Sequence, residues 1–276
     1  MGATSERLPI VPLDERDALA ALALSTEARW NQNESDWRFF LTRGLVFGVR
    51  DHDGQPIATA ALLPYTDHEA WISMVLVTKR WRRRKLATRL VDACLEAASR
   101  RGLTIWLDAT PAGAAVYAPL GFAPTVELRR LRFERTASPG PRPELFEGKF
   151  TDFVTRDIGA IGFDRRDFLA EVNGRPGSRL LSTRAALAMV RDGRTARHIG
   201  PVFAEDPNCA LALVAAIIAS EGEAHLIDAV ATHADFVDGL RQAGWTIERP
   251  FQRMRFGNEP QLAVEHPFAV AGPEFG

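Results

Sequence analysis

The chain has 276 residues, of which 46% are hydrophobic and 25% charged, so it is long enough for one or two domains with a sizeable core. These fractions are those of an ordinary soluble globular protein. The formal net charge of −1 argues against a dedicated nucleic-acid binder, so any basic cluster in the chain is local.

Nothing in the sequence predicts export or membrane insertion. Residues 1–13 lack the basic start and apolar core of a secretory signal. No apolar run is long enough to span a bilayer. We therefore expect a cytoplasmic protein, and we expect Cys94 and Cys209 to be reduced thiols within helices rather than a disulfide or a nucleophile.

The first part of the chain predicts helices followed by antiparallel strands. Asn33 or Ser35 is suited to cap the second helix, and Trp30, Trp37 and Phe39 are expected in the core or along a groove wall. The expected elements are a strand at 7–11, helices at 14–28 and 31–43, a hairpin of strands at 45–50 and 56–63 that turns at 51–54, and a strand at 70–77.

Residues 75–88 join the last of these strands to a helix through a cluster of cations. Apolar residues recur at helical spacing from Leu86 to Ala98, and every residue of 79–85 except Trp81 is cationic. Cations at a helix N-terminus oppose the helix dipole, so this pattern predicts a bound anion, most simply a nucleotide or coenzyme phosphate. A solvated basic helix start and a nucleic-acid patch are the alternatives.

A buried strand is expected at 103–109, followed by a short helix that carries Tyr117 and ends at Gly121-Phe122. A phenol can supply a proton to a departing thiolate. A packed tyrosine with a satisfied hydroxyl is the simpler interpretation of Tyr117.

Two motifs resemble those of the GNAT superfamily of N-acetyltransferases. The family motif (Gln/Arg)-x-x-Gly-x-(Gly/Ala) is matched at Arg82 and Ala87, with Lys85 in place of the first glycine, and the motif Tyr-x-x-x-Gly-Phe is matched by residues 117–122. The resemblance implies an α/β fold with a mixed sheet. It also implies that loop N–H groups bind the pyrophosphate of acetyl-CoA, that strand backbone holds the pantetheine arm, and that strand N–H groups polarise the thioester carbonyl.

The residues expected to bind the coenzyme through this resemblance are Val75, Leu76, Val77, Arg82, Arg83, Arg84, Lys85, Leu86, Ala87 and Thr88. Tyr117 is expected near the coenzyme sulfur, as the acid that protonates the thiolate. No metal is expected, because His and carboxylate residues never fall at ligand spacing.

No general base is assigned. Many family members have a glutamate four residues before the closing valine of the fourth strand, and Ser73 stands at that position here. Asp67, His68 and Glu69 precede the strand and Asp108 ends the next one. Any of these four could act as a base through a water molecule, but each is expected to be a solvated turn or strand-end residue.

The second half of the chain repeats the order of elements in the first half. Residues 136–150 hold three prolines and predict a linker, so the expected domains are 1–135 and 151–276. The expected elements of the second domain are helices at 152–158 and 166–172, strands at 179–183, 187–191 and 196–204, a helix at 207–220, a strand at 224–229, and residues 240–245 as the counterpart of 117–122.

The differences between the halves indicate that the second domain binds no coenzyme or binds it poorly. Its helix begins at the acidic residues Glu205 and Asp206, and Leu240 replaces Tyr117. We expect this domain to pack on the first and help wall the acceptor site, which Arg165, together with Asp164 and Arg166, could reach.

The sequence thus predicts two GNAT-like domains in tandem. The first would transfer the acetyl group of acetyl-CoA directly to a primary amine of a small molecule or peptide. A non-catalytic acyl-CoA sensor and a nucleic-acid-binding module are the rival interpretations. The acceptor, the acyl chain length and the oligomeric state, with a homodimer among the options, stay open.

Overall fold

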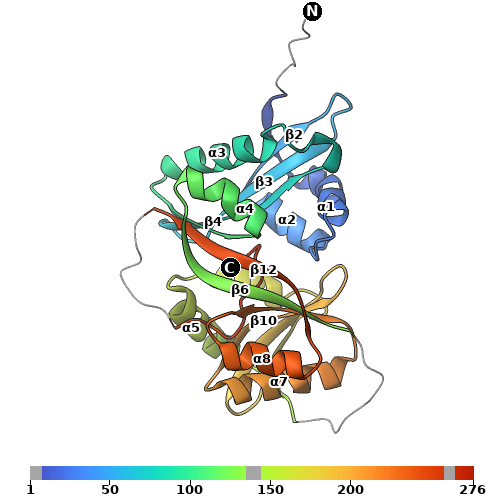
Figure 1. Ribbon diagram of the computed structural model, residues 1–276, viewed down its shortest axis with the longest axis vertical. Coiled ribbons are helices and arrows are strands. Elements are labelled where there is room, and N and C mark those ends of the chain that lie inside the picture. Colours follow the sequence, from blue (N-terminus) through green and yellow to red (C-terminus); the bar gives the residue numbers. More distant parts are fainter. Residues whose placement is uncertain (1–7, 135–143, 258–264) are drawn as a thin grey trace, which may run out of the picture. The chain divides into compact units, whose positions relative to one another are not determined.

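The computed structural model describes residues 8–134, 144–257 and 265–276 (Figure 1). Its contacts divide the chain into two compact units, Met1–Ile105 (unit 1) and Trp106–Gly276 (unit 2). Strand β5 (Thr104–Ala109) runs across this boundary. Among the described residues, no helix is both long enough and apolar enough to cross a membrane.

Unit 1 contains an antiparallel sheet in which β1, β2, β3 and β4 follow one another in space as in sequence. Every residue of β3 except its last is buried, because helices cover both faces of this sheet. Its elements are β1 (Ile10–Leu13), α1 (Ala18–Glu27), α2 (Glu34–Arg43), β2 (Leu45–Arg50), β3 (Pro56–Pro64), β4 (Glu69–Val77), α3 (Leu86–Ser99), and 3₁₀ turns at Glu15–Asp17 and Lys79–Trp81.

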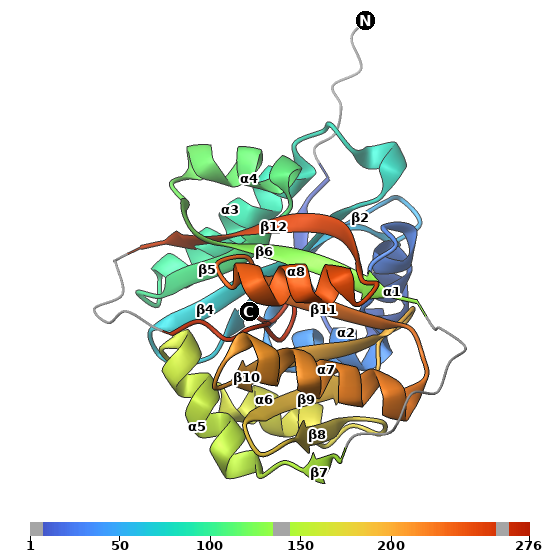
Figure 2. The same ribbon diagram turned by 60° about the horizontal axis from the view of Figure 1, so that its bottom comes forward.

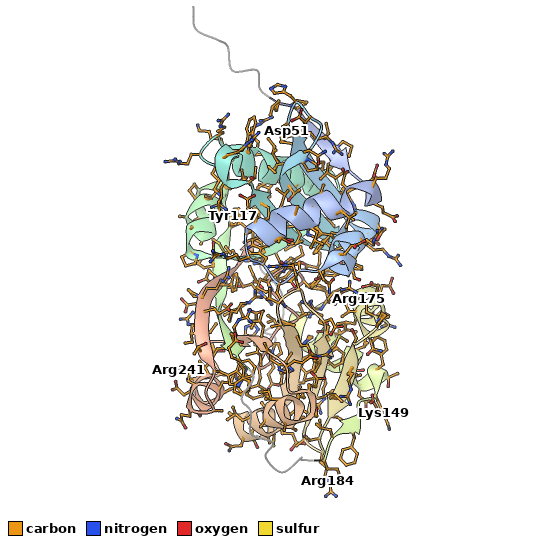
Figure 3. All side chains as sticks on the ribbon, turned by 90° about the vertical axis from the view of Figure 1, so that its right-hand side faces the viewer. Asp51, Tyr117, Lys149, Arg175, Arg184 and Arg241 are labelled. Carbon is orange, nitrogen blue, oxygen red and sulfur yellow. The ribbon has the colours of Figure 1, made fainter. Side chains whose placement is uncertain are left out.

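The predicted features of this region are largely confirmed. Asn33 caps α2 by accepting a hydrogen bond from the Asp36 N–H at 3.1 Å. Trp37 and Phe39 are buried in the core, and the Trp37 indole N–H donates to Ser25 Oγ at 3.0 Å, which ties α2 to α1. The predicted hairpin turn is present, with Asp51 at its tip (Figure 3). The first strand begins three residues later than predicted, at Ile10.

Unit 2 contains a mixed sheet with the strand order β5-β12-β6-β11-β10-β9-β8-β7. Strands β10 and β11 pair in parallel, whereas the pairs β12–β6, β6–β11, β10–β9, β9–β8 and β8–β7 are antiparallel. Its elements are α4 (Pro111–Tyr117), a 3₁₀ turn at Ala118–Leu120, β6 (Ala123–Phe133), β7 (Phe146–Glu147), α5 (Phe150–Ile161), α6 (Arg166–Asn173), β8 (Arg179–Ser182), β9 (Ala186–Arg191), β10 (Arg197–Ala204), α7 (Pro207–Glu221), β11 (His225–Val230), α8 (Ala234–Gln242) and β12 (Thr246–Phe256).

The core of unit 2 lies between its sheet and the adjacent helices α7 and α8 (Figure 2). Helix α7 contributes Leu213, Val214 and Ile217, and α8 contributes Phe236 and Leu240, all of them buried. Leu240, the counterpart of Tyr117, is therefore a core residue.

The two sequence repeats exchange their last strands. Strand β6 ends the first repeat but pairs with β11 of the second, whereas β12 ends the second repeat and lies between β5 and β6. The sequence did not predict either strand. Each is 11 residues long and rich in arginine, so neither shows the apolar pattern on which strand prediction depends.

The predicted linker falls partly outside the described residues, because 135–143 are not among them. Its described end forms β7, which pairs with β8 at the edge of the sheet. The boundaries 1–135 and 151–276 remain a prediction.

Candidate active site

Strand β4 is interrupted by a bulge before it reaches the cationic loop. Between the paired positions Ser73–Ala61 and Leu76–Thr59, β4 has two residues where β3 has one, and Met74 in this bulge adopts a left-handed φ of 53°. The Thr59 hydroxyl donates to the Met74 carbonyl oxygen at 2.8 Å and is buried. A bulge redirects the backbone that follows it, here the predicted pantetheine-binding residues 75–77.

The loop after β4 is anchored on both sides of its first turn. Glu27, the last residue of α1, accepts a hydrogen bond from the Lys79 N–H at 2.9 Å. The backbone bond to Lys79 and a side-chain bond from Thr78 lower the pKa of Glu27, so this carboxylate is charged near neutral pH. The Arg82 Nε donates to the Val77 carbonyl oxygen at 3.1 Å. Sequence reasoning missed Glu27, because nothing local connects α1 with this loop.

Four consecutive cations, Arg82 to Lys85, stand exposed at the start of α3, while the next residue, Leu86, is buried and anchors the helix. The Arg84 guanidinium lies 4.5 Å from the centre of the Trp81 ring, a cation–π contact.

The backbone of this loop adopts the conformation that glycine favours. Arg83 and Lys85 have φ values of 63° and 58°. Lys85 occupies the N-cap position of α3, and its side chain makes no cap hydrogen bond to the N–H groups of the first helical turn. Uncapped N–H groups beside four cations form a strong site for an anion. The left-handed φ also explains why the family motif has glycine where this chain has Lys85.

Tyr117 lies at the end of α4, a short helix in unit 2 that Thr110 caps by accepting from the Gly113 N–H at 3.2 Å (Figure 3). Tyr117 is half-buried, and its ring centre is 5.9 Å from that of Phe122. Phe122 in turn lies 5.5 Å from Phe256 of β12. The glycine of the motif, Gly121, has a φ of 100°, and a Cβ there would lie 3.1 Å from the Phe256 ring.

The structure brings the ten predicted coenzyme-binding residues together along β4, the loop and the first turn of α3 in unit 1. Tyr117 belongs to unit 2. Its role as the acid stays a prediction.

The residues considered as a general base lie in different environments in the structure. Asp67 and His68 are exposed in a turn closed by hydrogen bonds from the N–H groups of Tyr65 and Thr66 to the Glu69 carbonyl oxygen. The expectation that Asp108 is solvated is wrong, because its carboxylate is buried and paired with Arg253. Ser73 has a buried hydroxyl oxygen with no hydrogen-bond partner among the described residues.

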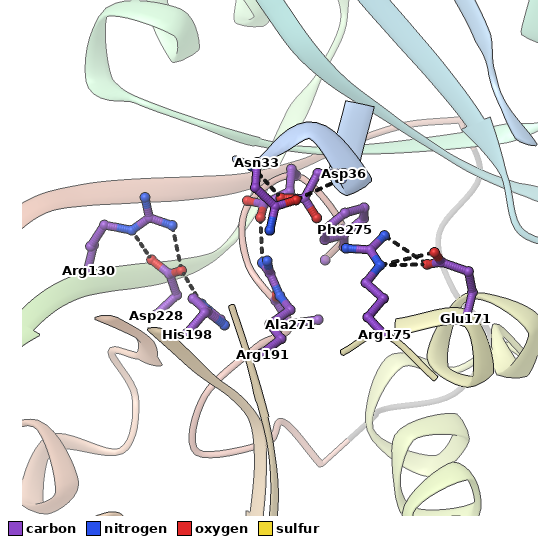
Figure 4. Close-up of polar contacts among 12 residues, drawn as sticks. Asn33, Asp36, Arg130, Glu171, Arg175, Arg191, His198, Asp228, Ala271 and Phe275 are labelled. Atoms are coloured by element: carbon purple, nitrogen blue, oxygen red, sulfur yellow. Dashed lines mark hydrogen bonds and ion pairs between the residues drawn. The ribbon is translucent and has the colours of Figure 1, made fainter. Parts of the chain in front are cut away.

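Asp108 and Arg253 form one of two matching buried ion pairs. The Arg253 Nε and Nη2 donate to the two Asp108 oxygens at 2.8 Å each. Burial, together with Asp228 and Glu274 nearby, raises the pKa of Asp108 against the pull of Arg253. In the second pair, the Arg130 Nε and Nη2 donate to Asp228 at 2.8 and 2.7 Å (Figure 4).

The two ion pairs occupy equivalent positions in the two repeats. In each pair, the arginine of one repeat binds the aspartate of the other, as the strand exchange requires. Arg130 and Arg253 are each the eighth residue of an 11-residue strand, and Asp108 and Asp228 occupy matching Asp-Ala sequences at the ends of β5 and β11. The sequence showed the repeat around the two aspartates. It did not predict the two strands that carry their arginine partners.

Asp228 has a second partner, the buried His198, whose Nε2 lies 2.9 Å from Asp228 Oδ2 (Figure 4). Burial opposes the charge on Asp228, but Arg130 and the bond from His198 outweigh burial and hold the pKa of Asp228 below its ordinary value. Burial and Arg191 lower the pKa of His198, so its imidazole is neutral.

Arg165 was predicted as a surface residue able to reach an acceptor, and this is wrong. Its guanidinium is buried, donates to both oxygens of Asp157 at 2.7 Å, and donates to the Phe275 and Gly276 carbonyl oxygens. Its neighbours Asp164 and Arg166 form an ion pair with each other.

Both cysteines lie in helices as predicted, Cys94 fully buried in α3 and Cys209 half-buried in α7, and neither forms a disulfide. Burial raises the pKa of Cys94 well above its ordinary value, so this thiol is inert. Within the described ranges, no three His, Cys, Asp or Glu side chains gather as a metal site.

Comparisons with known proteins agree with this geometry in both halves. Residues 15–122 match a model of the acetyltransferase (GNAT) family, and residues 154–269 match a second model of an acetyltransferase (GNAT) domain. Together they cover most of the chain.

Two named proteins are similar over nearly their whole lengths. An uncharacterized N-acetyltransferase of Bacillus subtilis, YitH, is 23% identical over 86% of this chain and 87% of its own. A holothin acyltransferase of a Pseudoalteromonas species is 24% identical over 90% of this chain and 87% of its own. A crystal structure from Pyrococcus horikoshii, of a protein named as an acetyltransferase, has a TM-score of 0.81 at 20% identity and covers 100% of this chain and 98% of its own.

Proposed function

The chain belongs to the GNAT acetyltransferase family, since both of its halves match models of that family, and from this premise we propose that it transfers an acetyl group from acetyl-CoA to a primary amine. It is an acyltransferase with two GNAT domains in tandem. We propose the identity of the acyl donor, the class of acceptor and the residues that bind and catalyse.

The observation that supports this most is the loop between β4 and α3. It combines a left-handed N-cap without a side-chain cap, Lys85, with four exposed cations. First-turn N–H groups are suited to a pyrophosphate, and guanidinium groups are suited to further phosphate oxygens. The bulged backbone of residues 75–77 would take the pantetheine arm as an added strand.

The proposed reaction is direct transfer. The neutral amine attacks the thioester carbonyl carbon, the new C–N bond forms, and the C–S bond breaks with the electron pair leaving on sulfur. Tyr117 would protonate the departing thiolate and the attacking nitrogen would lose its proton to water, with no side chain assigned as base. The acceptor is a small molecule or a peptide with a free amine.

Calorimetric titration with acetyl-CoA tests the donor site. We expect saturable binding by the wild type and a loss of at least tenfold in affinity in the double variant Arg83→Glu/Lys85→Glu, because both reversals place anions beside the phosphates. The control variant Arg101→Glu/Arg184→Glu makes the same charge change at two other exposed positions and should bind like the wild type. Equal losses in both variants would point to net charge instead of this loop.

A thiol-release assay then separates an enzyme from an acyl-CoA sensor. Thiol released from acetyl-CoA only in the presence of an amine would support transfer. The name of the Pseudoalteromonas relative says acyltransferase, so the panel includes longer acyl-CoA donors. If acetyl-CoA binds tightly but no thiol is released with any small-molecule amine or any peptide with a free N-terminus, the sensor is favoured.

A further inference from the structure

Residues 268–270 form a short segment between β10 and β11 of unit 2, and Ala269 makes a single β-bridge to each of these strands. On one side, the Val202 N–H donates to the Ala269 carbonyl oxygen at 3.0 Å and the Phe268 N–H donates to the Val202 carbonyl oxygen at 2.9 Å. On the other side, the Val230 N–H donates to the Phe268 carbonyl oxygen at 3.0 Å and the Val270 N–H donates to the Asp228 carbonyl oxygen at 3.0 Å. The side chains of residues 268–270 are buried.

The space for this segment exists because β10 and β11 separate. They pair only over Arg197–Ile199 and His225–Ile227, and β10 then bulges. Gly200 sits in the bulge, and a Cβ at this position would lie 2.1 Å from the Val270 carbonyl oxygen. No side chain is compatible with that approach, so glycine is what admits the segment.

The bulge in β10 matches the bulge in β4. Between Ile199 and Val202, β10 has two residues where β9 has one, just as β4 has two residues between Ser73 and Leu76 where β3 has one. Aligning the two bulges by their strand registers matches Val202 with Leu76 and Pro201 with Val75. The backbone groups that correspond to the proposed pantetheine-binding backbone of the first half are therefore already bonded to the chain itself.

Two other features of the second half also exclude a coenzyme. Pro201 has no N–H, whereas Val75 has one, so a backbone donor is missing. Asp206 caps α7 by accepting from the Cys209 N–H at 2.8 Å, whereas α3 has no side-chain cap. The N–H groups that would meet a phosphate instead face a carboxylate, which repels one.

We propose that residues 268–270 are a built-in occupant of the second half's coenzyme slot, so that one chain binds one coenzyme. The second half has kept the bulged, opened sheet of a coenzyme-binding domain and fills the opening with its own backbone. Only the comparison with a coenzyme in the first half rests on the proposed function. The occupancy of the slot rests on the hydrogen bonds above.

Hydrogen–deuterium exchange of the whole chain, with and without saturating acetyl-CoA, tests this. We expect the amides of Phe268 and Val270 to exchange as slowly as those of the β10–β11 core in both states, and the loop 78–88 to gain protection when the coenzyme is added. Fast exchange at 268–270, or a loss of protection there on adding acetyl-CoA, would overturn the proposal. Protection at 268–270 with no change anywhere on adding acetyl-CoA would support the occupancy of the slot, but it would overturn both the donor site and the stoichiometry of one coenzyme per chain.

Two alanine variants sharpen the result. Gly200→Ala should push the segment out and raise exchange at 268–270 at least tenfold. Gly159→Ala, on α5 where a Cβ meets nothing within 4 Å, should leave it unchanged. Unchanged protection in Gly200→Ala would contradict the packing argument, and if that variant fails to fold, the wild-type exchange decides. In the calorimetric titration the proposal requires one site per chain, and two sites would refute it.

Discussion

Arg253 on β12 holds Asp108 on β5 through two parallel hydrogen bonds, and both side chains are almost completely buried. Removing the arginine would leave a buried carboxylate without its partner, so Arg253→Met should lower the free energy of unfolding by about 3–5 kcal/mol. Denaturant unfolding measures this. The double variant Asp108→Leu/Arg253→Met should recover much of the loss, because it leaves no unpaired buried charge at this position.

The exposed ion pair of Arg100 and Glu96 provides the control. Arg100→Met should change the free energy of unfolding by no more than about 1 kcal/mol, since exposed pairs contribute little. Equal effects of the two arginine substitutions would mean that the Asp108–Arg253 pair is not buried in solution.

Glu27 positions the coenzyme loop by accepting the Lys79 N–H. Losing one such hydrogen bond is equivalent to about 1 kcal/mol, so Glu27→Ala should weaken acetyl-CoA binding about fivefold. Glu27→Gln keeps an acceptor oxygen and should bind within about twofold of the wild type. Tighter binding by Glu27→Ala would show that the carboxylate acts only by repelling the phosphates.

The left-handed φ of Lys85 makes a prediction about stability. Lys85→Gly and Lys85→Ala both remove the charge, but only glycine fits this φ without strain, so the glycine variant should be more stable by about 1 kcal/mol. Arg156, within α5, should show the reverse order, because glycine destabilises a helix interior by about 1 kcal/mol relative to alanine. Thermal unfolding of the glycine and alanine variants at both positions measures whether glycine is the more stable at Lys85 and alanine the more stable at Arg156.

Tyr117→Phe tests the proposed acid. The substitution keeps the ring contact with Phe122 and removes only the hydroxyl group. If the phenol supplies the proton, kcat should fall about 10²–10⁴-fold while acetyl-CoA affinity and the unfolding temperature stay unchanged. The second tyrosine of the chain, Tyr65, serves as the control, and Tyr65→Phe should keep normal turnover. An unaltered kcat in Tyr117→Phe would assign proton delivery to another group.

His198 should make the fold sensitive to mild acid. Its folded-state pKa lies below its ordinary value of 6.5, so in this range the unfolded chain binds a proton that the folded chain does not. The free energy of unfolding should therefore fall as the pH drops below about 6.5, by at most about 1.4 kcal/mol per pH unit for this group.

Burial also lowers the pKa of His266, which adds a slope of the same sign, so the informative quantity is the difference from a His198→Gln variant. Subtracting the variant's pH profile from that of the wild type should leave a single step that descends as the pH falls below about 6.5. A difference that is flat across this range would mean that His198 is charged in the folded state.

Much of the fold could be predicted because its helices and inner strands carry regular apolar patterns. Strand β4, the helix α3 and the paired repeat were all visible in this way, and the loop stood out because seven residues held six cations. The two motifs then identified the family.

What could not be predicted depends on contacts between distant residues. Strands β6 and β12 carry arginines at buried positions, which is stable only because Asp228 and Asp108 lie opposite them. The burial of Arg165 likewise depends on Asp157 and on the backbone of the last residues of the chain. Glu27 reaches the loop from 52 residues away. None of these partners has a local signature in the sequence.

The exchange of last strands makes the two repeats mutually dependent folding units. A fragment that ended after β6 would contain a strand that has lost β11 on one edge and β12 on the other, with Arg130 deprived of its carboxylate. Such a strand offers two open edges to other chains and would favour aggregation. Neither repeat could be deleted, duplicated or replaced by itself without breaking these strand pairs.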